Sequence, residues 1–81
     1  MIEEVKTKRI SKRYEVATIY EDYSESTYLI RRKGAEKLFE EKKQDFKNNK
    51  EIKKVLFNEV SLKDEEIITI PLERIEREEN K

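Results

Sequence analysis

The side chains that enzymes most often use for chemistry are largely missing from this sequence. Its 81 residues include no histidine, no cysteine, no tryptophan and a single glycine, while 47% are charged. General acid–base catalysis near neutral pH usually relies on histidine, or on a carboxylate or lysine whose pKa is shifted by burial. A domain of this length has one thin core and rarely provides the cleft that such burial needs. We therefore expect no catalytic residue and no enzyme activity.

The remaining nucleophiles and carboxylates form no recognisable catalytic or metal-binding pattern. The serines and threonines have no histidine to activate them, and one glycine cannot build a phosphate-binding loop. Glu40 and Glu41 are adjacent on an expected helix, so they do not face each other. Asp64, Glu65 and Glu66 could touch a hard cation, but their spacing matches no calcium loop. We expect no metal ion and no cofactor.

Basic residues form the most pronounced charged pattern, although the formal net charge is zero. Residues 26–54 carry ten basic and five acidic side chains, whereas residues 55–81 carry four and eight. If the first two strands pair antiparallel, basic groups from both collect at one end of the hairpin and attract phosphate. These candidate nucleic-acid-binding residues are Lys12, Arg13, Arg31, Arg32, Lys33 and Lys37. Neighbouring acids such as Glu15 and Glu36 would weaken such a patch.

All four tyrosines lie between positions 14 and 28, in or beside the first expected hairpin. Tyrosine is enriched at interfaces because it offers a large contact area at little cost in rotamer freedom. Tyr23 stands in the polar loop of that hairpin, where we expect it to be exposed. The predicted partner-binding residues are Tyr20, Tyr23, Arg31 and Arg32.

The first half of the chain predicts a hairpin followed by a helix. Residues 12–21 alternate with β-branched and aromatic side chains, and residues 27–31 resume that alternation after a polar segment. This pattern is typical of an antiparallel hairpin with a loop of about four to six residues. Beyond Gly34, apolar residues recur at helical spacing, which predicts an amphipathic helix over about 35–47. The pair Asn48-Asn49 would end it in a left-handed cap.

The second half of the chain predicts two more strands. Residues 52–62 include three consecutive apolar residues, 55–57, which indicate a central strand or one that a second copy covers. Ser61 to Asp64 has the pattern of a capping box, which predicts a short helical turn. Residues 67–70 form a strand that Pro71 either ends or restricts to a sheet edge. We expect residues 1–9 and 76–81 to fray.

These elements predict an α+β fold with β-β-α-β-β order. It is a single small domain over residues 1–81, with one antiparallel or mixed sheet covered by one amphipathic helix. No apolar run is long enough to span a membrane, and the first residues do not look like a signal peptide. We predict a cytoplasmic protein without a membrane partner.

The depleted chemistry favours function by surface contact. We predict a small non-catalytic protein-binding or regulatory module whose partner is another protein. Its composition is similar in style to compact phage or mobile-element proteins, some of which are inhibitors that occupy the surface of a larger protein. Homodimerisation through the sheet is a further hypothesis. The alternative function is a nucleic-acid-binding regulator that uses the basic end of the first hairpin.

Overall fold

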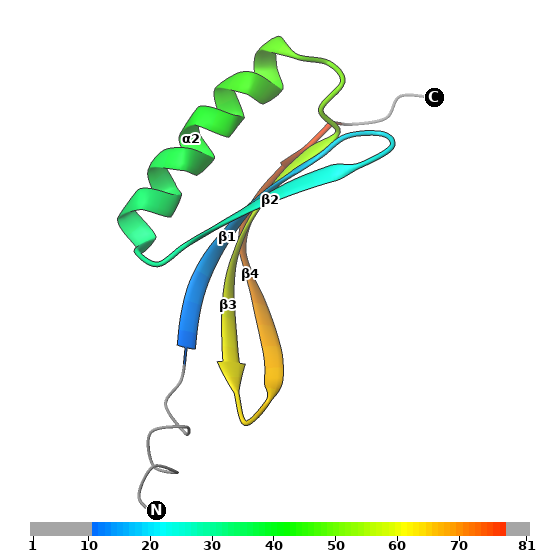
Figure 1. Ribbon diagram of the computed structural model, residues 1–81. Helices are drawn as coiled ribbons and strands as arrows, with labels where there is room; N and C mark the ends of the chain where they lie inside the picture. The colour runs from blue at the N-terminus through cyan, green and yellow to red at the C-terminus, as the bar shows by residue number, and fades with distance from the viewer. Residues whose placement is uncertain (1–10, 78–81) are drawn as a thin grey trace, which may run out of the picture.

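A computed structural model describes residues 11–77 of the chain. Within these residues one helix stands between two pairs of strands, which confirms the predicted α+β class and β-β-α-β-β order (Figure 1). The elements are β1 (Ser11–Ile19), β2 (Ser24–Leu29), α2 (Arg32–Asn48), β3 (Lys54–Lys63) and β4 (Glu66–Glu76). Of the residues predicted to fray, 1–9 and 78–81 lie outside the described residues. For the first two residues of the range 76–81 the prediction is wrong, because Glu76 ends β4 opposite Lys54 and Arg77 donates hydrogen bonds to backbone carbonyls.

The four strands form one sheet in the order β2-β1-β3-β4. Every neighbouring pair is antiparallel, which settles the predicted choice between an antiparallel and a mixed sheet. The loop between β1 and β2 has the predicted length, because Ile19 pairs with Ser24 across it. Its predicted position is wrong: β2 begins at Ser24 rather than at residue 27 and ends at Leu29 rather than at residue 31, because the polar residues 24–26 pair with β1. β3 lies between β1 and β4, so the apolar run at 55–57 belongs to a central strand and needs no second copy to cover it.

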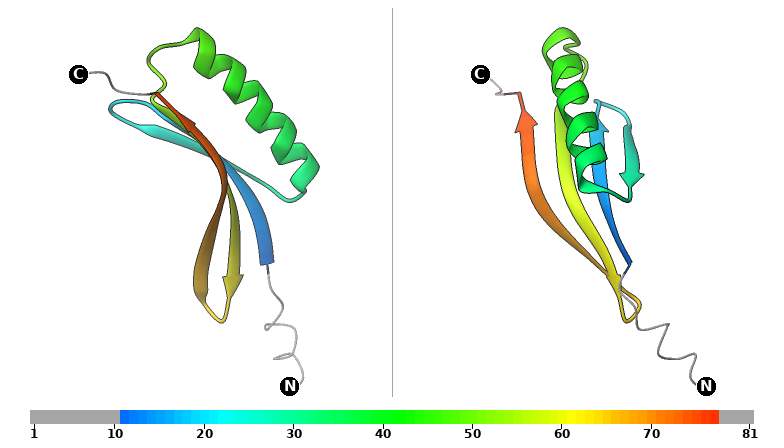
Figure 2. Two further views of the ribbon diagram at one scale, coloured as in Figure 1. Left: turned by 180° about the vertical axis from the view of Figure 1, so that it is seen from behind. Right: turned by 90° about the vertical axis from the view of Figure 1, so that its left-hand side faces the viewer.

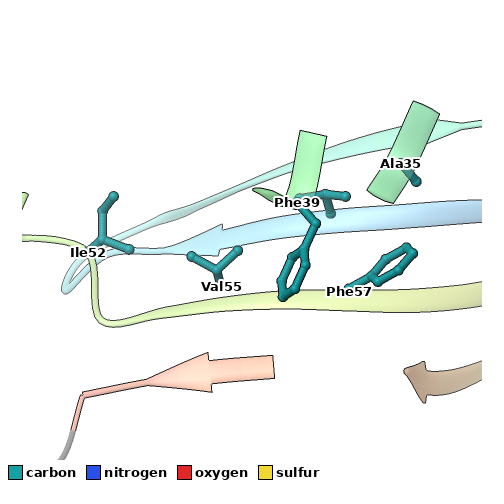
Figure 3. Close-up of a cluster of buried hydrophobic side chains, with 6 residues drawn as sticks. Ala35, Phe39, Ile52, Val55 and Phe57 are labelled. Carbon is teal, nitrogen blue, oxygen red and sulfur yellow. The ribbon is translucent and has the colours of Figure 1, made fainter. Parts of the chain in front are cut away.

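The helix covers one face of β1, β2 and β3 because its apolar stripe faces the sheet. Ala35 and Phe39 are its fully buried side chains, and the ring centroids of Phe39 and Phe57 lie 5.4 Å apart. Figure 3 shows these side chains converging between helix and sheet. The buried core cluster consists of Val16, Ala35, Phe39, Ile52, Val55 and Phe57.

The helix begins three residues before its predicted start. Gly34 is not a boundary, because its φ is not positive and it occupies the first turn of α2. The predicted end at Asn48-Asn49 is confirmed. The predicted left-handed cap is wrong, since Asn49 is extended with φ −126°. Its side-chain oxygen instead accepts a hydrogen bond from the backbone N–H of Glu51.

The segment around Ser61 to Asp64 is not helical, in contrast to the prediction. β3 continues through Lys63, which pairs with Glu66 across a two-residue turn. Asp64 and Glu65 have φ of 52° and 67°, the combination that a type I′ hairpin turn requires. A capping box stabilises a helix by only about 1 kcal/mol. The backbone hydrogen bonds that continue the pairing of β3 with β4 stabilise the strand by more than that. β4 continues past Pro71 on the sheet edge, the second of the two predicted alternatives.

The helix does not reach the far part of the β3–β4 hairpin. Figure 1 shows α2 lying across the upper half of the sheet while β3 and β4 extend beyond it to their turn. The side view in Figure 2 shows the same arrangement, with β4 away from the helix. A shift in pairing between Phe57 and Asn58 marks the bend between the covered and uncovered halves. None of the described helices has the length and apolarity needed to cross a membrane.

Candidate protein-binding surface

The two tyrosines predicted to bind a partner stack on each other at the turn between β1 and β2. The ring centroids of Tyr20 and Tyr23 are 4.5 Å apart, and their planes differ by 8°. The backbone N–H of Tyr20 donates to the carbonyl of Tyr23, which closes the turn. Tyr23 is 57% exposed, as predicted. Tyr20 is half-buried and packs against the core, so it also stabilises the fold.

The phenol of Tyr20 lies in an environment that disfavours its charged form. Burial raises the pKa of Tyr20, and the carboxylates of Glu25, Asp45 and Glu51 act in the same direction, as does the phenol of Tyr23. Tyr20 therefore stays neutral at physiological pH. Its side chain packs against the buried core cluster.

Arg31 and Arg32 lie at the opposite end of the first hairpin from the tyrosine pair. The register places Ile19 opposite Ser24 at one end and Tyr14 opposite Leu29 at the other. Arg31 precedes α2 without a side-chain cap. Arg32 donates to Glu36 at 3.0 Å and lies 5.9 Å from the ring centre of Phe57. The four predicted partner-binding residues therefore do not form one site.

The six basic residues of the alternative prediction do not form a uniform patch. Consecutive strand residues face opposite sides of a sheet, so Lys12 and Arg13 are separated. Lys12 forms an ion pair with Glu59 at 3.6 Å. Lys33 and Lys37 line an open groove near α2 together with Arg32 and with the acids Glu36, Glu40 and Glu73. Acidic groups thus interleave with the basic ones, and nucleic-acid binding stays a prediction.

The face of the sheet opposite the helix carries a polar network that the sequence did not reveal. Glu15 accepts hydrogen bonds from Ser26 Oγ at 2.8 Å, Tyr28 Oη at 3.2 Å and Asn58 Nδ2 at 3.0 Å. One carboxylate therefore joins β2, β1 and β3. Only the strand register, which brings Glu15 opposite both Tyr28 and Asn58, makes this network visible.

The far end of the β3–β4 hairpin exposes apolar side chains on both of its faces. Leu62 and Ile67 pair with each other on the face opposite the helix and are 47% and 73% exposed. Ile68 and Ile70 lie on the other face and are 40% and 46% exposed. We call these four residues and the turn that joins the strands the hairpin tip. Four exposed apolar side chains thus gather at one end of a single hairpin.

An open groove extends the hairpin tip across the face opposite the helix. Its volume is about 620 Å³. Ile67 and Leu62 line one side, while Tyr28, itself 58% exposed, lies across from them beside Glu15. The groove combines apolar and aromatic area with a few polar groups, as protein-binding surfaces do. The run Ile67-Ile68-Thr69-Ile70 was a signal for this surface, since it places isoleucines on both faces of one strand.

Comparison of the chain with protein-family models, curated proteins and solved structures gave no match. Within residues 11–77, no group of three carboxylates is arranged to hold a metal ion.

Proposed function

We propose that this chain is a small non-catalytic module that binds another protein through the hairpin tip and regulates it by occupying its surface. The observation that carries the proposal is the exposure of isoleucines on both faces of a hairpin that α2 does not cover. Exposed apolar side chains on a strand weaken solubility and raise the risk of aggregation. A partner that buries them offsets this cost.

Local backbone strain at the same place supports the proposal. Asp64 and Glu65 both have positive φ; aspartate tolerates this conformation, whereas glutamate rarely adopts it. Glutamate at such a position costs about 1 kcal/mol. Exposed isoleucines and a strained turn thus coincide in one short segment. Functional sites are where such departures from locally favourable structure tend to gather.

A matched pair of charge substitutions tests the proposal. Ile67→Lys places a charge on the hairpin tip, and Ile30→Lys places the same charge on an isoleucine of similar exposure, 68%, outside it. Both positions are exposed, so neither change should alter the fold. The tagged chain and the two variants serve as baits in lysate of the native host.

We expect the unmodified chain and Ile30→Lys to retain one stoichiometric protein partner. Ile67→Lys should lower its recovery by about tenfold, because a charge would then have to be buried in the contact. Equal recovery by both variants would show that the partner binds elsewhere. Failure of the unmodified chain to retain any protein would count against a binding function.

A further inference from the structure

We infer that a second copy of this chain pairs antiparallel with the open edge of β4, joining two four-stranded sheets into one. This goes beyond the proposed function, because edge pairing uses the backbone of the hairpin whereas partner binding uses its two faces. Pairing would leave those faces exposed and bring two hairpin tips together.

The two edges of the sheet differ in a way that selects β4. β2 is one edge and has only six residues, of which Ser24, Glu25, Ser26 and Thr27 are polar. β4 is the other edge and has eleven residues, beginning with a mostly apolar run. Proteins protect exposed edges with short strands and charge. β2 carries that protection along its whole length, whereas β4 has it only from Pro71 and the bulge onward, and its residues 67–70 have none.

The backbone of β4 presents hydrogen-bonding groups to this open edge. In a two-residue hairpin turn the flanking residues exchange backbone hydrogen bonds, and bonded pairs then alternate along the ladder. The Lys63–Glu66 pair flanks the turn and is therefore bonded. Every second residue after Glu66 is bonded as well, so the backbone groups of Ile68 and Ile70 form hydrogen bonds with β3. Ile67 and Thr69 therefore direct their N–H and C=O groups outward. Pro71 belongs to the same outward set, which explains why its missing N–H costs the ladder nothing.

The side chains of β4 match a second copy of the same strand. When two antiparallel β4 strands pair with Thr69 opposite Thr69, Ile68 of each copy lies opposite Ile70 of the other. Four isoleucines then form one cluster on the helix side of the joined sheet. Cross-strand pairs of β-branched residues are the contacts that stabilise sheets.

The charges along the hairpin favour the antiparallel orientation. The acidic residues Asp64, Glu65 and Glu66 occupy its turn, while Arg74 lies toward the other end of β4 and is 63% exposed. Antiparallel pairing brings Arg74 of each copy opposite Asp64 of the other, while it places Glu73 opposite Glu65. Parallel pairing would place the two acidic turns together and would be repulsive. The antiparallel orientation therefore gives less like-charge repulsion than the parallel one.

Sedimentation velocity over a range of concentrations, combined with single-cysteine cross-linking, tests this inference. The chain contains no cysteine, so each variant carries one thiol. Thr69→Cys should form a covalent dimer under mild oxidation, since Cα atoms of a bonded pair are about 5.5 Å apart, within disulfide range. Thr27→Cys, on the β2 edge, is the matched control and should remain monomeric.

A concentration-dependent dimer that Thr69→Pro shifts to monomer would support the pairing, because proline removes an outward N–H while leaving the bonds to β3. The cross-linking result stands even if that variant does not fold. A monomer at every concentration, or equal cross-linking by both cysteine variants, would overturn the pairing. The proposed function would survive such a result if Ile67→Lys still lost the captured protein.

Discussion

The guanidinium of Arg77 ties the end of β4 to the loop that follows α2. It donates hydrogen bonds to the carbonyls of Phe46, Ile52 and Asn49 at 2.7–3.1 Å, and it lies 4.1 Å from the ring centre of Phe46. Cationic groups near a helix C-terminus satisfy carbonyls that have no partner in the helix. One side chain therefore holds helix, loop and strand together.

Arg77→Ala should lower the free energy of unfolding by about 1–3 kcal/mol, because it leaves the two part-buried carbonyls of Phe46 and Ile52 without their charged donor. Arg77→Lys should restore less than half of that loss, since an ammonium cannot reproduce the planar guanidinium fork. Urea denaturation measures both values. Full recovery with lysine would mean that charge alone, rather than geometry, stabilises this corner.

Tyr20 predicts how stability responds to alkaline pH. Its folded-state pKa is raised, so the folded protein favours the neutral phenol. The neutral phenol of Tyr20 contributes fully to the free energy of unfolding below the unfolded-state pKa of about 10. That contribution is lost as the pH rises through the pKa of Tyr20 in the folded protein. The free energy of unfolding should therefore fall more steeply above pH 10 in the unmodified chain than in Tyr20→Phe. Thermal unfolding as a function of pH measures this slope.

Tyr28→Phe is the control for that experiment, because it removes an exposed phenol and leaves Tyr20 in place. It should retain the alkaline slope of the unmodified chain. If Tyr20→Phe and Tyr28→Phe show the same slope, burial of Tyr20 does not contribute to the pH dependence.

At the scale of elements, the turn between β3 and β4 is the place where sequence and backbone conformation agree least. Glu65 adopts φ 67° in a turn that favours glycine at this position. Glu65→Gly should stabilise the protein by about 1 kcal/mol. Glu66→Gly, one residue later in a regular strand, should destabilise it by about 0.5–1 kcal/mol. Opposite signs in urea denaturation would confirm the type I′ turn, and equal losses would contradict it.

Local patterns predicted most elements and failed where tertiary pairing outweighed them. Alternation located β1 and β2, and helical spacing located α2, because both patterns reflect one buried face. The capping pattern at Ser61 was misleading, since pairing of β3 with β4 extends through Lys63. The early start of α2 was equally hidden, because Arg32 and Lys33 are unfavourable near the positive end of a helix dipole.

At the scale of the whole molecule, one helix is too short to cover the whole sheet. α2 has 17 residues and spans about 25 Å, whereas β4 has 11 residues and spans about 36 Å. The tyrosine pair lies near one end of the first hairpin, and the arginines lie at the other. The uncovered hairpin tip extends beyond the arginine end (Figure 1). These separate surfaces follow from the position of the helix on the sheet.

The candidate surface could not be predicted from sequence, because it depends on the strand register and on where the helix lies across the sheet. Tyr20 and Arg31 both flank the first hairpin, and only the register shows that they are at its opposite ends. The isoleucines at 67, 68 and 70 have the composition of a core strand. Their exposure depends on where α2 stops covering the sheet, and that position is set by packing between residues far apart in the chain.

Amide hydrogen exchange at Ile67 and Thr69, followed by NMR in dilute and concentrated solutions, gives the sharpest check that the hairpin tip associates with other chains. Both amides face the open edge, so they should exchange at least about tenfold more slowly in the concentrated solution, where exchange requires the pair to open. The amides of Ile68 and Ile70, bonded to β3, should be protected in both solutions. Equal and rapid exchange of Ile67 and Thr69 at both concentrations would show that no strand pairs with β4.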